Sequence, residues 1–166
     1  MMVVLLMLFC ILNLLNVFNL RIATIKDAEI TYKWANDSII RQFSFSKDKI
    51  EWSSHKKWFL NKINSEQCVY LILDEDTSPV GSIRFDINQD SCGVISYLVA
   101  PLFHGRGFGE ILLKNGIDKL IELMPDIHVV TGTVFKENKA SVRIFEKSGF
   151  QIASEDHFSV EYIKKI

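Results

Sequence analysis

The sequence is poor in cysteine and proline, and it carries no marked excess of charge of either sign. Its three cysteines, Cys10, Cys68 and Cys92, are an odd number, lie far apart and include no Cys-x-x-Cys pair. This pattern is typical of reduced, structural thiols in a cytosolic protein, and we expect no bound metal. A net charge of −1 lacks the electrostatic footprint of a nucleic-acid-binding protein. We therefore expect no nucleic-acid partner.

Internal repeats and low-complexity linkers are also absent. A chain of 166 residues, of which 48% are apolar and 23% charged, is large enough for a proper core and is globular rather than disordered. We expect one compact domain. The sequence leaves its oligomeric state open.

One long hydrophobic run is present, at the N-terminus. Residues 1–18 (MMVVLLMLFCILNLLNVF) carry no charge and could just cross the hydrocarbon core of a bilayer as a helix. The run has neither the basic start nor the small-residue cleavage site of a signal peptide. Arg21 and Lys26 follow it, which would keep the rest of the chain in the cytoplasm. A membrane anchor and a spurious extension from a start codon placed too far upstream both stay open, and in both the domain comprises residues 19–166.

From residue 20 onward the hydrophobic pattern predicts a mixed α/β domain. Strands are expected at residues 20–25, 68–74, 79–86, 92–99, 127–134, 150–154 and 158–165. Helices are expected at residues 27–36, 47–63 and 138–149, and from the glycine-rich stretch HGRGFG up to Pro125. Acidic, proline- and glycine-bearing turns between the strands are typical of antiparallel hairpins.

The stretch HGRGFG (104–109) places three of the eight glycines between a strand and a helix. A helix that starts there presents unpaired backbone N–H groups at its positive end, which suits a phosphate group. Gly105, Gly107 and Gly109 would let a pyrophosphate approach the main chain, and Arg106 could add a charge. The stretch lacks the Gly-Lys-Ser/Thr of a P-loop and the glycine spacing of a dinucleotide-binding fold. By itself it favours a phosphate cradle over a plain tight turn.

Two segments resemble motifs of the GNAT superfamily of acyl-CoA N-acyltransferases. VFKENKASVRIFEKSGFQ (134–151) is similar to its closing motif, in which an Asn, a small residue, an aromatic and Lys-x-Gly-Phe recur at this spacing. YLVAPLFHGRGFGEILL (97–113) resembles its acetyl-CoA loop, Gln/Arg-x-x-Gly-x-Gly/Ala, with His104 in place of the Gln or Arg. The resemblance covers residues 20–166. It implies an α/β (mixed α+β) fold, with a mostly antiparallel twisted sheet of about seven strands flanked by about four helices.

The same resemblance implies acetyl-CoA as co-substrate. Backbone groups of Leu98 and Val99 would bind the pantetheine arm, residues 104–109 the pyrophosphate, and Asn138 with the following helix the rest of the cofactor slot. The implied cofactor-binding residues are Leu98, Val99, His104, Gly105, Arg106, Gly107, Phe108, Gly109, Asn138 and Phe145. Because the contact at position 104 is mostly made by the backbone, we expect the site to survive the change to histidine.

WANDSIIRQFSFS (34–46) and HKKWF (55–59) resemble a narrower group within the superfamily, which acetylates the amine of a nucleotide-activated sugar in the pseudaminic acid pathway. The resemblance implies that the two helices carrying these segments wall the acceptor cleft. The implied substrate-binding residues are Trp34, Asn36, Arg41 and His55. Tryptophans on amphipathic helices are more often plain core, and we favour that interpretation for Trp58.

The usual acid and base of the superfamily are both missing from the sequence. Phe145 stands where many GNAT enzymes have a tyrosine that protonates the departing sulfur, and Val94 where related families often carry a glutamate. A thiol pKa near ~8.5 makes the thiolate a fair leaving group without an acid. Neutralising a lysine of pKa ~10.4 at pH 7 costs about 4.6 kcal/mol, whereas an amine of pKa ~8 costs only about 1.4 kcal/mol. The sequence therefore favours an amino sugar or a protein N-terminus as acceptor and disfavours lysine.

Histidine and tyrosine side chains remain as catalytic candidates. His55 is the favoured proton acceptor, because an unperturbed histidine is half neutral near pH ~6.5, and His128 is the reserve. The side chain of Tyr97 either faces the thioester or only packs against the sheet.

Three functions stay open. The first is an N-acetyltransferase acting on a nucleotide-linked amino sugar of the UDP-4-amino-4,6-dideoxy type. The second is a protein N-terminal acetyltransferase of the ribosomal-protein type, one strand of which resembles SYLVAP (96–101). The third is a catalytically weak acyl-CoA-binding module, which the absence of a hydroxyl at Phe145 makes conceivable.

Overall fold

The computed structural model describes residues 18–166, so the hydrophobic run lies outside the described residues except for Phe18. The strands are β1 (Phe18–Ile22), β2 (Cys68–Glu75), β3 (Ser78–Ile87), β4 (Cys92–Val99), β5 (Val129–Phe135), β6 (Gln151–Glu155) and β7 (Ser159–Lys165). The α-helices are α2 (Ala28–Asn36), α3 (Ser38–Arg41), α4 (Trp52–Ile63), α5 (Phe108–Leu123) and α6 (Lys139–Lys147). Two 3₁₀ turns are η1 (Ile25–Asp27) and η2 (Pro101–Phe103). No helix in this part of the chain is long and apolar enough to cross a membrane.

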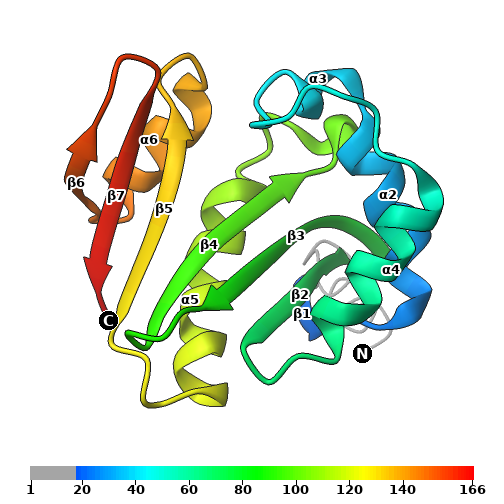
Figure 1. Ribbon diagram of the computed structural model, residues 1–166, viewed down its shortest axis with the longest axis horizontal. Coiled ribbons are helices and arrows are strands. Elements are labelled where there is room, and N and C mark those ends of the chain that lie inside the picture. The colour runs from blue at the N-terminus through cyan, green and yellow to red at the C-terminus, as the bar shows by residue number, and fades with distance from the viewer. Residues whose placement is uncertain (1–17) are drawn as a thin grey trace, which may run out of the picture.

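The seven strands form one twisted sheet in the order β1-β2-β3-β4-β5-β7-β6 (Figure 1). Every neighbouring pair is antiparallel except β4 and β5, which run parallel. Short turns join β2, β3 and β4, and α5 makes the crossover that a parallel pair requires. The expected mixed fold with a mostly antiparallel sheet of seven strands is confirmed.

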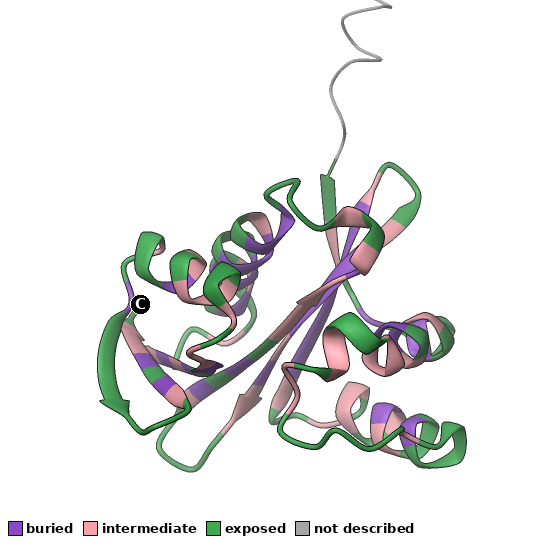
Figure 2. Ribbon diagram, turned by 90° about the horizontal axis from the view of Figure 1, so that it is seen from above, coloured by how far each residue is buried: buried purple, intermediate pink, exposed green. Residues whose placement is uncertain are grey.

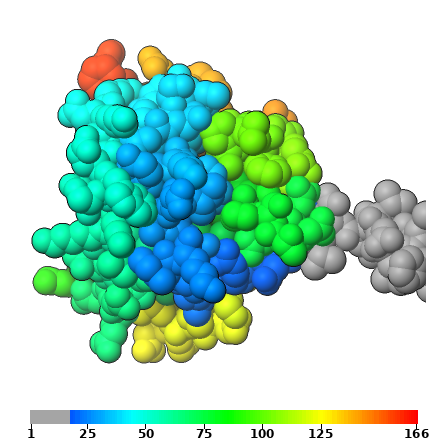
Figure 3. All heavy atoms as spheres, turned by 90° about the vertical axis from the view of Figure 1, so that its right-hand side faces the viewer, coloured from blue at the N-terminus to red at the C-terminus, as the bar shows by residue number. Residues whose placement is uncertain are grey.

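Helices cover both faces of the sheet (Figure 2). α5 and α6 bury one face in the main core, which includes Phe85 of β3 and Leu112 of α5. α2 and α4 cover the other face with a smaller cluster that includes Phe59 and Tyr70. Figure 3 shows these two helices side by side, in blue and blue-green. Next to them, side chains of β4 on the same face are exposed, such as Val94 at 39%.

The second expected helix, at residues 47–63, begins only at Trp52. The amide of Asn36 exchanges two hydrogen bonds with the backbone of Ile50, at 2.8 and 3.1 Å. These bonds hold the chain extended before Trp52, so a tertiary contact overrides the helical pattern. The short helix α3 was not expected, and the α-helices therefore number five in the described residues rather than about four.

The first strand is shifted relative to the expected residues 20–25. It begins at Phe18, whose ring packs edge-on against Phe108 with centroids 5.5 Å apart. It ends at Ile22 because Thr24 and Asp27 form a capping box that starts η1.

A charge network ties β1 to β2 and to the start of α2. The Nε of Arg21 donates to Asp74 at 2.7 Å, and its two terminal nitrogens donate to the carboxylate of Asp27 at 2.8 Å. The aspartates are 7% and 5% exposed. Burial raises the pKa of Asp27, but hydrogen bonds from Arg21 and Thr24 outweigh this and hold it below its ordinary value. Asp27 therefore stabilises the fold as an anion.

Removing the charge of Asp27 should destabilise the domain. We expect Asp27→Asn to lower the free energy of unfolding by about 2–3 kcal/mol, because Arg21 loses a bidentate partner in a largely buried setting. The folded pKa of Asp27 is lowered, so its contribution is present above the unfolded value near ~3.9 and is lost as the pH falls through the folded value. Urea unfolding at neutral and acid pH should show weaker acid sensitivity in the variant. Glu29→Gln, in an exposed pair with Lys33, is the control and should leave the midpoint nearly unchanged; equal midpoints for both variants would contradict the prediction.

Candidate functional site

β4 and β5 separate soon after they meet. Their parallel pairing runs only from Cys92–Val129 to Val94–Thr131. Beyond these pairs, within the described residues, β4 pairs only with β3, and β5 only with β7. The two strands diverge toward their carboxyl ends (Figure 1). This divergence, called the β4–β5 split below, leaves backbone groups along both sides without a strand partner.

The register decides which backbone groups face the β4–β5 split. The N–H of Ala100 donates to the C=O of Val80 at 2.9 Å, and residues of an antiparallel pair alternate in the direction of these groups. Val99 therefore points its N–H and C=O toward the split, as Tyr97 does, whereas Leu98 points its own toward β3. Of the two residues expected to bind pantetheine through the main chain, Val99 has the required direction and Leu98 does not.

The glycine stretch 104–109 forms the turn into α5. Gly105 and Gly107 have φ values of 77° and 83°, in the left-handed region, and Gly107 is the N-cap of α5. A Cβ added to either would meet no atom within 4 Å, so the backbone conformation and not crowding demands glycine there. Gly109 differs, because its Cβ would lie 2.7 Å from Cδ1 of Ile144. Gly109 lets α5 pack closely against α6.

The side chains of His104 and Arg106 have partners within the protein. The Nε2 of His104 lies 2.8 Å from the C=O of Val99 and must carry the proton, since a carbonyl only accepts. Arg106 donates to Glu75 at 2.5 Å, and its guanidinium lies 4.9 Å from the ring centroid of Phe108. Glu75 thus balances the charge that Arg106 was expected to add. The groups that this loop leaves for an anion are its backbone N–H groups at the positive end of α5.

α6 lies behind the β4–β5 split, on the same face as α5. Asn138 caps it by accepting a hydrogen bond from the N–H of Ser141 at 3.1 Å. The hydroxyl of Tyr97 donates to Oγ of Ser141 at 2.9 Å, which ties β4 to α6 across the split. Burial raises the pKa of Tyr97 despite the hydrogen bond with Ser141, so the phenol is protonated at neutral pH.

Phe145 belongs to the core. The residue is 1% exposed, and its ring centroid lies 4.7 Å from that of Phe150 and 5.2 Å from that of Tyr162. A Cβ on Gly132 would come within 2.6 Å of its Cζ, so the glycine in β5 makes room for the ring. Without a hydroxyl, Phe145 contributes shape to this part of the site and no proton.

The fold and the glycine loop match a known family. A model of the acetyltransferase (GNAT) domain matches residues 18–151. The chain belongs to the GNAT acetyltransferase family. Acetyltransferase PseH of Campylobacter jejuni is 28% identical over 133 residues, which are 79% of this chain and 81% of that protein. Spermidine N-acetyltransferase from Vibrio cholerae, solved with coenzyme A and spermine, superposes with a TM-score of 0.80 at 16% identity, over 89% of this chain and 95% of that one.

A further structural relative is RimL, the ribosomal L7/L12 alpha-N-protein acetyltransferase, solved with coenzyme A. Its TM-score is 0.78 at 15% identity, over 90% of this chain and 94% of that one. At such low identity these likenesses show the fold alone. As a GNAT acetyltransferase, the protein is an acyl-CoA-dependent N-acetyltransferase with acetyl-CoA as co-substrate. A positive-φ glycine loop at a helix N-terminus beside a split in the sheet fits that co-substrate.

Three of the expected acceptor-binding residues instead have structural partners. Trp34 is 6% exposed and offers no face to a bound ring. Asn36 uses both groups of its amide on Ile50. Arg41 donates to backbone C=O groups of the loop at residues 46–48. These side chains hold the segment 37–51 in position.

His55 lies in an aromatic cluster between α2 and α4. Its Nε2 is 3.2 Å from the hydroxyl of Thr31, which itself donates to the C=O of Asp27. The rings of Trp58 and Phe59 lie 5.4 and 5.9 Å from the imidazole. Burial lowers the pKa of His55, so the imidazole is neutral, but only 4% of the residue is exposed. Packing explains His55 better than proton transfer from a bound amine does.

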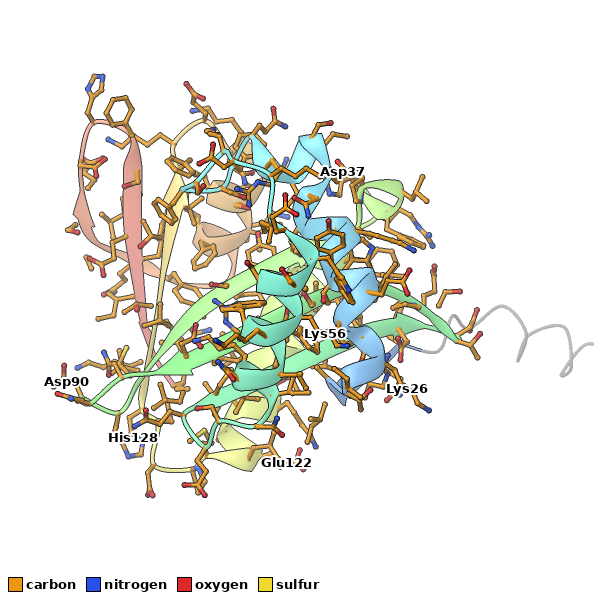
Figure 4. The ribbon with its side chains drawn as sticks, turned by 45° about the vertical axis from the view of Figure 1, so that its right-hand side comes forward. Lys26, Asp37, Lys56, Asp90, Glu122 and His128 are labelled. Atoms are coloured by element: carbon orange, nitrogen blue, oxygen red, sulfur yellow. The ribbon has the colours of Figure 1, made fainter. Side chains whose placement is uncertain are left out.

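His128 does not reach the site. It immediately precedes β5, and Figure 4 shows it beside Asp90 at the end of the sheet opposite Asp37. β4 begins at that end, whereas the split opens at the other. The reserve assignment of His128 as proton acceptor is therefore wrong.

The face of β4, β5 and β7 that α2 and α4 leave uncovered carries polar groups that no sequence motif indicates. Strand alternation places Ser96, Thr133 and Glu161 there, because their strand neighbours are in the main core. A shallow hollow of about 290 Å³, called the polar hollow below, is lined by Thr133, Ser154, Glu155, Asp156, Ser159 and Glu161. No sequence motif marks these residues, since their meeting depends on the pairing of β5, β6 and β7.

An aromatic pair lies beside the polar hollow. Phe45, 75% exposed, reaches from the segment 37–51 to Phe135 at the end of β5, with ring centroids 4.9 Å apart. Phe135 is the register partner of Ser159, which lines the hollow. The ammonium of Lys47 lies 5.8 Å from the Phe135 ring centroid. The segment 37–51 therefore reaches across the open face to the far side of the β4–β5 split.

Replacing Gly107 with valine should abolish acetyl-CoA binding in a protein that still folds. A side chain there would stand where the pyrophosphate approaches the main chain, and the residue would resist a positive φ. Gly149→Val is a matched control, because Gly149 also has a positive φ, of 77°, and open space around its Cβ but lies at the other end of α6. Calorimetry should show lost affinity for Gly107→Val and retained affinity for Gly149→Val. Equal affinities in both would show that the loop does not hold the pyrophosphate.

Tyr97→Phe tests whether this phenol protonates the departing sulfur. We expect kcat to fall by much less than the ~10²–10⁴-fold of general acid catalysis, because a thiolate of pKa ~8.5 leaves readily at neutral pH. Stability should drop by about 1 kcal/mol for the lost hydrogen bond. Ser141→Ala removes the same bond and keeps the phenol. A hundredfold loss in Tyr97→Phe alone would identify Tyr97 as the acid.

Proposed function

We propose that acetyl-CoA lies along the β4–β5 split with its pyrophosphate on the glycine loop. The backbone N–H of Val99 faces the split and is the group for the pantetheine arm. The N–H groups of residues 105–109 receive the pyrophosphate. Asn138 and α6 form the other wall of the slot. The positive φ of Gly105 and Gly107 supports this placement, since it presents main-chain groups with no side chain in front of them.

We propose that the acceptor is the primary amine of a nucleotide-linked amino sugar of the UDP-4-amino-4,6-dideoxy type. The observation that carries this proposal is the polar hollow, where hydroxyls of Thr133, Ser154 and Ser159 stand among carboxylates on the open face. Such a lining can hydrogen-bond the hydroxyls and amine of a sugar. The 28% identity to Acetyltransferase PseH and the likeness of residues 34–46 to the sugar-amine group support the same choice.

The aromatic pair supports a nucleotide on the same acceptor. Phe45 and Phe135 offer ring surface at the edge of the polar hollow, and Lys47 adds a cation nearby. A nucleoside diphosphate presents a planar base and two phosphates, which match an aromatic ring and a cation. A free amino sugar would leave these groups unused.

Protein N-terminal acetylation is the second candidate. The fold likeness to RimL supports it, and an N-terminal amine has the low pKa that a site without the usual acid and base favours. The polar hollow weighs against it, because a peptide N-terminus has few hydroxyls to satisfy the lining. The weak acyl-CoA-binding module is the remaining alternative, supported by Phe145.

Acetyl transfer should be measured on a UDP-4-amino-4,6-dideoxy sugar, on a peptide with a free N-terminus and on spermidine. We expect kcat/KM for the amino sugar to exceed that for the other two by roughly a hundredfold or more, because its hydroxyls can hydrogen-bond the hydroxyls and carboxylates of the polar hollow and the other two acceptors form fewer such bonds. Coenzyme A release and mass spectrometry of the product are the measurements. Preference for the peptide would establish the second candidate. Acetyl-CoA binding without turnover on any amine would support the weak module.

A further inference from the structure

The β4–β5 split determines where the amine must arrive. α6 occupies the face behind the split, so an acceptor can approach an acetyl group there only from the face that carries the polar hollow. Thr131 is the last residue of β5 paired with β4, and Thr133 lies two residues beyond it on the open face. A proton acceptor for the amine must therefore lie on this face, near the level of Thr133.

Glu161 of β7 occupies that position. It is the register partner of Thr133, so its Cα lies about 5 Å from that of Thr133 across the pair. Tyr162 and Val160 on either side are in the main core, which directs Glu161 to the open face. Ser154 of β6 donates to its Oε2 at 2.9 Å, and this bond holds the carboxylate against the floor of the polar hollow.

The neighbouring carboxylates are committed to other partners. Glu155 is paired with Lys136 at 2.7 Å. Asp156 accepts from the N–H groups of Phe158 and Ser159, and these bonds hold its pKa below the ordinary value. Glu161 forms no ion pair with another described residue within 4 Å, so its Oε1 is available to a ligand.

Asp86, on the same face of β3, is also committed. It is paired with Lys62 at 2.8 Å and with Arg84 at 2.9 Å. The ion pairs with these two cations stabilise the charged form of Asp86, so Asp86 is a poor acceptor of a proton from an amine. Of these four described carboxylates, only Glu161 combines the required position with an oxygen that no described residue binds.

We propose that Glu161 is the proton acceptor of the reaction. This rests on the acceptor placement given under Proposed function. The neutral amine donates its lone pair to the thioester carbon and the C–N bond forms. The nitrogen, now positively charged, gives one proton to the carboxylate of Glu161. The C–S bond breaks with its electron pair on sulfur, and the proton passes from Glu161 through solvent to the thiolate, which restores the carboxylate and yields the amide and coenzyme A.

The test compares Glu161→Ala with wild type in the presence and absence of added formate. We expect kcat to fall roughly a hundredfold, within the ~10²–10⁴ range of general base catalysis, while the KM for acetyl-CoA stays within about threefold. Formate should restore part of kcat in Glu161→Ala in proportion to its concentration and should not stimulate wild type, because a small carboxylate can fill the vacated position. Glu122→Ala, an exposed carboxylate on α5 paired with Lys119, is the control and should behave as wild type.

The measurements are made on both the UDP-linked amino sugar and the N-terminal peptide. The proposed acceptor class and the proposed role of Glu161 are thereby tested independently. If wild type turns over only the peptide, the acceptor class is wrong, and loss with formate rescue on the peptide still supports Glu161. A kcat within about threefold of wild type in Glu161→Ala, or a large loss without rescue by formate, would overturn the role of Glu161. Turnover of neither amine by wild type would overturn both proposals.

Discussion

The divergence of β4 and β5 is the constraint on which the site depends. The parallel pairing ends at Val94 and Thr131, and the sheet then opens instead of continuing its ladder. Unpaired backbone groups cost free energy when they are buried, so an opening of this kind persists only where other groups or a ligand satisfy them. The bond from Tyr97 to Ser141 and the packing of Phe145 on Gly132 hold α6 behind the opening. The split is thus supported from one face and open on the other.

The loop that we propose to hold the cofactor offers main-chain groups rather than free side chains. Gly105 and Gly107 supply a backbone shape and Gly109 a close approach of helices, and these two uses share only the absence of a Cβ. His104 binds the carbonyl of Val99, and Arg106 binds Glu75. Both side chains stabilise the turn from within. Replacing the family's Gln or Arg by His104 therefore need not remove a contact to the cofactor.

The proposed acceptor side differs, because the polar hollow is lined by side chains on adjacent strands and their turn. α2 and α4 contribute buried packing through Trp34 and His55, and the hydrogen bonds of Asn36 and Arg41 hold the segment 37–51 in place. That segment brings Phe45 to Phe135. The helices that carry the family-like motifs thus position a loop over the open face. The polar groups on that face come from strands far away in the sequence.

The sequence by itself determined most of the elements, the mixed sheet and the glycine-rich turn into α5. Each of these depends on local patterns: alternation in strands, helical spacing in α5, and glycines before a helix N-terminus. The tertiary structure decided the rest. It started α4 at Trp52 through the contact between Asn36 and Ile50, and it buried His55 among aromatic rings. It brought Glu161 beside Thr133, because strand register is set by which strands pair and not by spacing along the chain.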